Sequence, residues 1–408
     1  MSITDELNGV PLRQRRHNTG RVLEVLLGAS DPATVSELMA HTGLSRQSVH
    51  ALCDDLIGIG LVIEREPIAP RSATGVGRRS RAFALNERAG FVAGVELGPE
   101  RIVAQLCDLR GDIVASTALE SPDPTRQATD LIEDAKGIVD ELVAASGVDP
   151  GLVTTLAVGV PAPVDHNGVA GRATRVPGLP GINVVEAFSS GRTWAVLADN
   201  DANFAVVGER WRGIAQGVDN VILLLVDERL GAGILDSGRI IKGGNGYAGQ
   251  MDFVTLLEGG RGTRGIVTLI ERLLEEVSDA DRSRLTSTRL THEATTTLTR
   301  GRRVQEANAV FDAALEGDLV ARTIIDAVAD RLARVTAVVA TLFNPDMIVF
   351  GCDVPRDAET ILEPVRRRLA PLMQSDPPDL VRSGLQGQAV ATGAVRSALD
   401  FAHQRLLP

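Results

Sequence analysis

The sequence contains few cysteines and no long apolar run, and both absences narrow the class of protein. Its three cysteines, Cys53, Cys107 and Cys352, are too widely spaced to indicate a disulfide framework or a cysteine zinc site. No apolar run reaches the roughly 18 residues that span a bilayer, and residues 1–16 lack the apolar stretch of a signal peptide. We therefore expect a soluble cytoplasmic protein with no membrane partner.

The charge is unevenly distributed along the chain. The net charge of the 408 residues is −11, which argues against a protein coated in nucleic acid. Residues 1–90 hold 11 arginines, no lysine and 10 acidic residues, so their net charge is +1, and that of the remainder is −12. The length predicts two or three domains. This asymmetry favours a small nucleic-acid-binding head on a larger acidic body.

Residues 13–88 have the pattern of a winged helix-turn-helix domain, after a polar segment, residues 1–12, that we expect to be a flexible tail. A first helix is predicted over residues 15–27. Thr34 and Glu37 form a capping-box pattern for the second helix. Gly43 ends that helix, and Ser45 caps a third helix over residues 46–57. The short turn between these two helices is typical of a helix-turn-helix.

The third helix and the segment after it carry the residues that we expect to contact DNA. Arginine and glutamine can bind purine edges through two hydrogen bonds, whereas serine and a helix N-terminus suit phosphate. Two strands, over residues 61–64 and 81–85, flank a basic glycine-rich loop that is suited to lie along the phosphate backbone as a wing. The candidate DNA contacts are Ser45, Arg46, Gln47, Ser48, His50, Arg71, Arg78 and Arg79. The alternative is a small helical domain that binds protein, with its arginines solvated.

From residue 89 onward, short β-like runs alternate with longer helical ones, which indicates an α/β sheet with crossover helices. The predicted strands cover residues 91–97, 101–109, 152–160, 193–197, 221–226 and 347–350. The predicted helices cover residues 130–145, 202–212, 266–276, 319–342, 358–372 and 391–407. Strand-rich segments begin near Val92 and near Val221, so we expect two related lobes.

Several glycine-rich motifs follow one another in a fixed order in the body, residues 89–408, and their order is more informative than any one of them. They read GVELG at 94–98, DLRG at 108–111, VGVPAPVD at 158–165, ADNDAN at 198–203, GAGILDSG at 231–238, GGNGYAG at 243–249 and NPDMIVFG at 344–351. In this order the chain resembles the ROK family of repressors and sugar kinases. The resemblance implies a two-lobed actin-like ATPase fold over residues 89–408, with the C-terminal helix returning to the first lobe.

The resemblance also implies a sugar-binding site. Asp201 matches the base that takes the hydroxyl proton in the family's kinases, Asn200 matches a sugar contact, and Gln250 stands in place of a sugar-binding glutamate. The other interpretation of Asp201 is a cap for the helix over residues 202–212. We assign no catalytic residue, because the ATP side of the pattern is altered.

The motifs for ATP and zinc have changed in this sequence. Glu96 replaces the aspartate of the first phosphate loop, and Asp227-Glu228-Arg229 replaces the start of the second. Carboxylates at these positions would repel phosphate. Phe253 replaces a histidine that binds sugar and zinc, and residues 259–268 lack the family's three thiolates. We therefore predict no ATP, no cofactor and no metal; residues 259–268 either pack around Phe253 or form a loop with another ligand.

Together these features predict a DNA-binding transcriptional regulator, a repressor that binds operator DNA as a homodimer or homotetramer and responds to a sugar or sugar phosphate. One alternative is an ATP-dependent sugar kinase with an extra DNA-binding head. The other is a ligand-independent regulator whose ROK domain only oligomerises.

Overall fold

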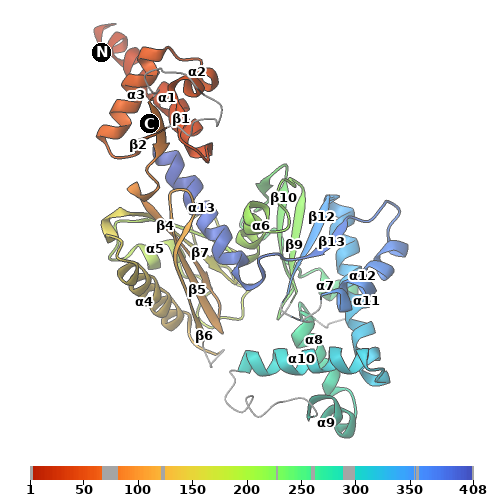
Figure 1. Ribbon diagram of the computed structural model, residues 1–408. Helices are drawn as coiled ribbons and strands as arrows, with labels where there is room; N and C mark the ends of the chain where they lie inside the picture. The colour runs from red at the N-terminus through yellow and green to blue at the C-terminus, as the bar shows by residue number, and fades with distance from the viewer. Residues whose placement is uncertain are drawn as a thin grey trace.

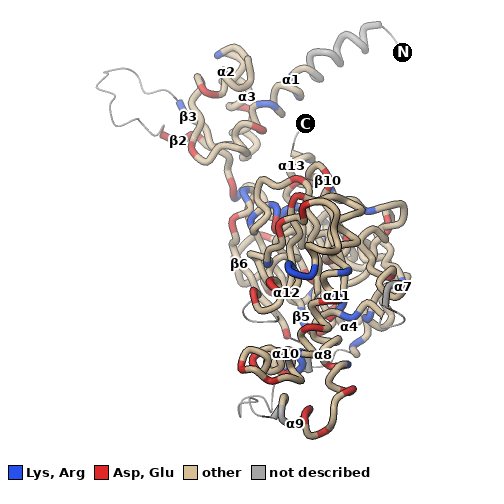
Figure 2. Tube along the Cα trace, turned by 90° about the vertical axis from the view of Figure 1, so that its right-hand side faces the viewer, with Lys and Arg blue, Asp and Glu red and all other residues tan. Residues whose placement is uncertain are grey.

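The computed structural model describes residues 3–66, 81–120, 125–226, 228–258, 262–287, 299–352, 354 and 358–406. Figure 1 shows a small head that carries the N-terminus, and two lobes that are each built on a β-sheet. In the turned view of Figure 2 the head again stands at one end of the molecule, and α8, α9 and α10 lie at the other. No helix in the described ranges is long and apolar enough to cross a membrane.

The head has three helices and a small sheet with the strand order β1-β3-β2. These elements are α1 (Ile3–Gly28), β1 (Ala33–Thr34), α2 (Val35–Thr42), α3 (Arg46–Gly58), β2 (Val62–Arg65) and β3 (Ala82–Leu85). Val22, Leu38, Val49 and Phe83 are fully buried in its core. Apolar residues from all three helices and from β3 therefore hold the head together.

The local signals in the head predicted α2 and α3 well, whereas α1 is longer than expected. Thr34 and Glu37 form both hydrogen bonds of the capping box, and Gly43 adopts the left-handed conformation with φ 67° after α2. The helix α1 begins at Ile3, so residues 3–12, which we expected to be a flexible tail, are helical. Extending a helix costs far less than starting one, so a polar segment can continue a helix that is packed further along.

Each lobe has a five-stranded sheet, and the two sheets share one topology. The first has the order β6-β5-β4-β7-β8 and the second β11-β10-β9-β12-β13. In each sheet the central strand, β4 or β9, precedes the other four in the chain, pairs antiparallel with the strand that follows it, and pairs parallel with the fourth. This repeat confirms the expectation of two related lobes.

The first lobe packs α4 and α5 against one face of its sheet. Its elements are η1 (Glu87–Ala89), β4 (Phe91–Leu97), β5 (Arg101–Asp108), β6 (Ile113–Glu120), α4 (Ala128–Ser146), η2 (Pro150–Leu152), β7 (Val153–Val160), α5 (Val184–Ser189) and β8 (Ala195–Asn200). Leu131 and Val139 of α4 are fully buried in its core with Val95 and Val158 of the sheet.

The second lobe is larger because it adds a group of helices beyond its sheet. Its elements are β9 (Val221–Leu225), β10 (Gly231–Asp236), β11 (Arg239–Ile240), α7 (Val254–Glu258), α8 (Ile266–Glu275), α9 (Asp279–Ser287), α10 (Thr299–Leu315), α11 (Leu319–Phe343), β12 (Met347–Gly351), α12 (Glu359–Leu369), η4 (Ala370–Leu372) and β13 (Asp379–Arg382). Phe253 is partly buried and packs against the core of this lobe.

Two helices, α6 (Asp201–Arg212) and α13 (Ala389–Leu406), cross each other between the two sheets. In the chain, α13 directly follows the short η5 (Gln386–Gln388). A Cβ atom on Gly393 would lie 1.7 Å from the carbonyl oxygen of Phe204, and one on Gly208 would lie 2.4 Å from that of Ala389. Neither distance leaves room for a side chain, so glycine permits the close approach of the helices. The crossing joins α13, the last helix of the chain, to both lobes.

The head is packed directly on the first lobe. Leu23 and Leu85 of the head form an apolar cluster with Leu109 of the first lobe and Leu406 at the end of α13. Arg110 Nη1 donates a hydrogen bond to the carbonyl oxygen of Ala29 over 2.6 Å. The helix α13 runs from the space between the lobes to the base of the head (Figure 1).

Candidate ligand cleft and nucleic-acid interface

A cleft of about 450 Å³ lies between the two lobes. Its wall includes the ends of β4 and α13 from one side, and β9 and the segment before β10 from the other. Asn200, Asp201 and Gln250, the three residues predicted to bind a ligand, all line it. The fold therefore brings together side chains from the first lobe, the crossing helix and the second lobe. The volume suits a small organic molecule.

Asn200 and Asp201 are positioned by the N-terminus of α6. Asn200 is buried and caps the helix: its Oδ1 accepts a hydrogen bond from the Ala202 amide over 3.1 Å, and its Nδ2 donates to the carbonyl oxygen of Ala162. Asp201, the first residue of α6, also accepts from the Ala202 amide, over 2.8 Å. Asn200 is thus the cap that we had considered for Asp201. The second carboxylate of this segment, Asp199, forms an ion pair with Lys242 and is not among the residues that line the cleft.

Burial raises the pKa of Asp201 to about 6, against the opposing effects of hydrogen bonds from Ala202 and Asn200 and of the positive charge of Arg229. A carboxyl group with a pKa near neutrality can accept a proton or a hydrogen bond from a hydroxyl group. The arrangement of Asp201 therefore suits a hydroxylated ligand, whether or not the ligand reacts.

Gln250 is held in place by the backbone. An isolated antiparallel bridge pairs it with Gly231 at the start of β10, and its amide N–H donates to the carbonyl oxygen of Tyr247 over 3.2 Å. The Tyr247 hydroxyl in turn accepts a hydrogen bond from the Arg172 amide across the cleft, over 3.0 Å. The Gln250 loop is therefore tied to both lobes.

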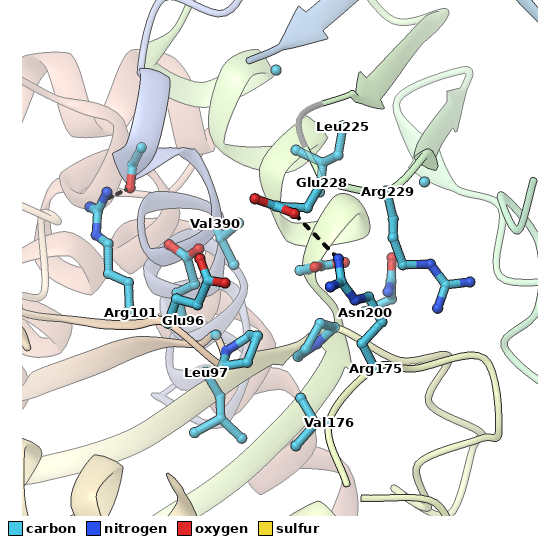
Figure 3. A pocket seen from close by; sticks show the side chains of 18 of the residues that line it. Glu96, Leu97, Arg101, Arg175, Val176, Asn200, Leu225, Glu228, Arg229 and Val390 are labelled. Atoms are coloured by element: carbon cyan, nitrogen blue, oxygen red, sulfur yellow. Dashed lines mark hydrogen bonds and ion pairs between the residues drawn. The ribbon is translucent and has the colours of Figure 1, made fainter. Parts of the chain in front are cut away.

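Carboxylates occupy the part of the cleft where the family's kinases hold ATP phosphates. Glu96 lies near the end of β4, Glu100 follows that strand, and Glu228 precedes β10; all three line the cleft. Figure 3 shows Glu96 and Glu228 facing into it. Two negative charges about 4 Å apart repel by about 1 kcal/mol in water and by more in a drier cleft. This repulsion is the reason for our prediction that the cleft does not bind ATP.

These carboxylates also form an ion-pair network that joins the lobes. Glu228 Oε2 lies 3.3 Å from Arg175 Nη1 and 3.4 Å from Arg303 Nη1. Arg303, on α10, also pairs with Glu100 of the first lobe, and the side chains of this pair are only 10% and 8% exposed. Arg175 lies in the first lobe, so the network connects the lobes at two points. In Figure 3 the dashed line that starts at Glu228 marks its contact with Arg175.

The segment that carries zinc ligands in the family is hydrogen-bonded to the altered phosphate loop. Thr268 Oγ1 donates to the carbonyl oxygen of Glu228 over 2.7 Å, and Arg229 Nη2 donates to Thr263 Oγ1 over 2.9 Å. Arg331, buried on α11, donates to the carbonyl oxygen of Gly262. The part of residues 259–268 that the structure describes begins at Gly262 and contacts the loop before β10. Its Ile266 and Val267 lie in the core against which Phe253 packs, which agrees with the first of the two arrangements that we expected. Among the described residues no cluster of three or more His, Cys, Asp or Glu side chains could hold a metal.

In the head, the first turn of α3 presents the predicted base-reading side chains. Ser45 caps the helix, with its Oγ 3.2 Å from the Ser48 amide nitrogen and 2.9 Å from Ser48 Oγ. Arg46 and Gln47 follow it and are exposed. Ser45 and Ser48 thus fix the start of the helix, and Arg46 and Gln47 project from it.

His50, one turn further along α3, is half-buried. Its ring makes an edge contact with Phe83, with the ring centroids 6.4 Å apart, and Nδ1 lies 3.4 Å from Arg81 Nη1. Asp54, one turn further along α3, also pairs with Arg81. The structure therefore places His50 against β3 and leaves the base-reading end of α3 to Arg46 and Gln47. The predicted wing residues Arg71, Arg78 and Arg79 lie outside the described residues.

Three arginines that the sequence reasoning did not select lie at the two candidate sites. Arg21 Nη2 of α1 lies 4.0 Å from where a Cβ of Gly43 would be, beside the turn that leads into α3. Arg175 and Arg229 line the cleft. The sequence signal for Arg229 was its place in the altered second phosphate loop. Nothing in the sequence marked Arg21 or Arg175.

Comparisons with known proteins agree with this architecture. Residues 92–404 match the ROK family and residues 16–70 match the MarR family. The chain is 25% identical over 352 residues to a putative xylose repressor from Caldicellulosiruptor sp. (strain Rt8B.4), covering 82% of each chain. It is 28% identical over 223 residues to a glucokinase from Thermotoga maritima, covering 52% of this chain and 68% of the glucokinase.

A solved structure resembles the whole chain. It is described as a ROK family transcriptional regulator, a homologue of the E. coli MLC protein, and it superposes with a TM-score of 0.69 at 21% identity, covering 96% of this chain and 98% of its own. This likeness shows the shared fold, head included. From the family match over both lobes we conclude that this chain belongs to the ROK family and carries a MarR-type winged-helix domain in front of its ROK domain.

Proposed function

We propose that the protein is a transcriptional repressor of the ROK family, with residues 13–88 as the DNA-binding domain and residues 89–408 as the ROK domain. The observation that carries this proposal is a single one: a winged-helix head is packed directly on a two-lobed body whose cleft keeps hydroxyl-binding side chains and holds carboxylates at the phosphate positions. A curated relative that covers most of the chain is named a putative xylose repressor. We place the protein in the cytoplasm with its DNA.

The head would read DNA with the first turn of α3. Arg46 and Gln47 are exposed there and can form paired hydrogen bonds to purine edges in the major groove. Arg21 lies beside the preceding turn, where a cation would contact phosphate. Asp54 and Asp55, further along α3, pair with Arg81 and Arg15. The groove contact is therefore centred on the N-terminal end of the helix.

The effector would be a sugar or a derivative of one that binds between the lobes. Asn200, Asp201 and Gln250 supply an amide, a carboxyl group and a second amide on one cleft, which are the groups that bind hydroxyls. The repressor assembles as a symmetric homodimer or homotetramer, because two half-sites in DNA need two recognition helices at a fixed separation. Movement of the lobes would change that separation.

The helix α13 would carry the change from the cleft to the head. Ala389 and Val390 at its start line the cleft, and Leu406 at its end packs in the cluster with Leu23 and Leu85 of the head. At 1.5 Å per residue, its 18 residues span about 27 Å. A ligand that moves the first turn of α13 would therefore also move the base of the head.

Binding of labelled DNA at several salt concentrations tests the DNA assignment. Arg46→Ala should weaken binding to the preferred sequence by about 1–3 kcal/mol and leave binding to unrelated sequences nearly unchanged. Replacement of Arg78 and Arg79 should weaken binding to all sequences and flatten the salt dependence. Arg334→Ala, on α11 of the second lobe, removes an equal charge far from the head and should have no effect. Unchanged affinity in both head variants would refute the assignment.

A sugar kinase is the second candidate, because Asp201 lies in the cleft and a glucokinase is among the relatives. The three cleft carboxylates count against it, and we propose that the protein is not an enzyme. Release of ADP in the presence of a panel of hexoses and amino sugars tests this. Turnover that Asp201→Ala abolishes would establish the kinase.

A further inference from the structure

We infer that the ligand of the cleft carries an acidic group, a carboxylate or a phosphate, which Arg229 binds together with Arg175. This inference rests on the proposed function, because it takes the cleft to be an effector site. It narrows the effector from a neutral sugar to a hydroxylated acid. The acidic group would be bound by two arginine side chains, and not by the backbone amides of a glycine-rich phosphate loop.

Arg229 is a half-buried cation without a carboxylate partner in the described part of the chain. Among the described residues its side chain donates one hydrogen bond, from Nη2 to the Thr263 hydroxyl over 2.9 Å, and forms no ion pair within 4.0 Å. Buried or half-buried charges in proteins are usually paired, because an unpaired one loses its hydration without compensation. Burial lowers the pKa of Arg229 and the positive charge of Arg175 lowers it further, while the carboxylates of Asp252 and Asp201, which form no ion pair with it, raise it. An anion from the ligand would remove this imbalance.

The neighbouring carboxylates are already occupied. Glu228 Oε2 is shared between Arg175 and Arg303, and Arg303 is also paired with Glu100. Glu228 Oε2 therefore serves two cations, and neither of these pairs involves Arg229. Arg175 is 45% exposed at this point, so it can turn one of its guanidinium N–H groups towards a ligand while Glu228 keeps its contact with Arg303.

The position of Arg229 fits the same ligand as the hydroxyl-binding residues. Arg229, Asn200, Asp201 and Gln250 line one cavity, and Figure 3 shows Arg229 and Asn200 in it. Asp201 and Arg229 are close enough for each to shift the charge equilibrium of the other. Arg175 and Arg229 also line a second cavity, of about 460 Å³, on their far side. A ligand whose hydroxyl groups bind Asp201 and whose acidic group binds Arg229 would therefore place that acidic group at the wall between the two cavities.

Calorimetric titration of the full-length protein tests the inference. The probes are D-gluconate, glucose 6-phosphate and inorganic phosphate as anions, with D-glucitol as the neutral polyol, all at one ionic strength. We expect at least one hydroxylated anion to bind wild type more tightly than D-glucitol does. In Arg229→Gln that anion should bind at least about tenfold more weakly, while any binding of D-glucitol is unchanged. Gluconate and glucose 6-phosphate separate the carboxylate from the phosphate.

Three further variants make the result specific. Arg229→Lys should restore part of the affinity, because it keeps the charge without the planar guanidinium. Arg272→Gln, in the second cavity but paired with Glu275 and Glu276, should bind the anions as wild type does. Arg175→Gln should weaken them less than Arg229→Gln.

The inference is overturned if the anions bind Arg229→Gln as they bind wild type, or if none of them binds wild type. Tight binding of D-glucitol alone would support the effector cleft and refute its acidic ligand. DNA binding by the same preparations is a separate readout, so failure of the repressor assignment is distinguishable from failure of the anion site.

Discussion

The most informative single residue in the cleft is Asp201, because its environment makes its charge costly. Burial holds its pKa at about 6, against 3.8 for an ordinary aspartate. A group whose pKa is raised on folding stabilises the fold most at low pH, and this contribution is lost as the pH rises through the folded-state pKa. The ionised carboxylate therefore destabilises the ligand-free protein at neutral pH.

Asp201→Asn should consequently stabilise the protein at every pH above about 4, with the full gain from about pH 6 upward. At pH 8 we expect a gain of about 1–3 kcal/mol in the free energy of unfolding. The gain should shrink as the pH falls from 6 to 4, because the wild-type carboxyl group takes up its proton. Thermal unfolding from pH 4 to pH 8 measures it. Asp376→Asn, at an exposed site, should show no such trend; a parallel trend there would show that Asp201 is not the cause.

Sequence reasoning anticipated which residues meet in the cleft but not how they are paired. The motif order placed Asn200, Asp201 and Gln250 together, and the fold brings them onto one cavity. The contacts of Arg303 could not be predicted, since this residue is far along the chain from Glu100 and Glu228, with which it pairs. The contact of His50 with Phe83 could not be predicted for the same reason, since it depends on where β3 lies; the role of His50 in binding DNA stays a prediction.

At the scale of elements, the crossing of α6 and α13 is the tightest contact between helices that we describe. Gly393→Ala should lower the free energy of unfolding by at least about 2 kcal/mol, because its Cβ would overlap the carbonyl oxygen of Phe204 and force the helices apart. Chemical denaturation measures the loss.

Gly137→Ala is the matched control for this substitution. Gly137 also lies inside a helix, α4, but it is exposed and no atom lies within 4 Å of where its Cβ would be. Alanine there should stabilise the protein by about 0.5–1 kcal/mol through helix propensity. Equal effects at the two glycines would contradict the account of the crossing.

Elements with buried, regular patterns were predictable, and elements shaped by their neighbours were not. The strand predicted over residues 91–97 coincides with β4, and the helix predicted over residues 319–342 with nearly all of α11. β6 was not predicted, because it lies at the edge of its sheet and most of its side chains are partly or fully exposed. β10 was read as a glycine loop from its first residues, yet it pairs with β9 along its length.

For the whole molecule, the ion pair of Glu100 with Arg303 should hold the lobes in their present arrangement. A double-mutant cycle with Glu100→Gln and Arg303→Met should give a coupling energy of about 1–3 kcal/mol, because both side chains are nearly buried. Thermal unfolding of the four proteins measures it.

The pair of Arg334 with Asp330 provides the comparison within one helix. Its side chains are 54% and 50% exposed, so the same cycle should give about 0.5 kcal/mol or less. A coupling no larger at Glu100 and Arg303 than at this surface pair would mean that the contact between the lobes adds nothing to their association.

The course of α13 has a consequence for genes that this protein controls. The helix begins in the wall of the cleft and ends against the head. If it couples ligand binding to DNA binding, as we propose, the coupling acts in both directions, because thermodynamic coupling between two sites is reciprocal. If bound ligand lowers the affinity of the protein for an operator by some factor, bound operator must lower its affinity for the ligand by the same factor. A strong operator would then be released only at high ligand concentration and a weak one at low concentration, so DNA sequence alone would rank the genes in order of response.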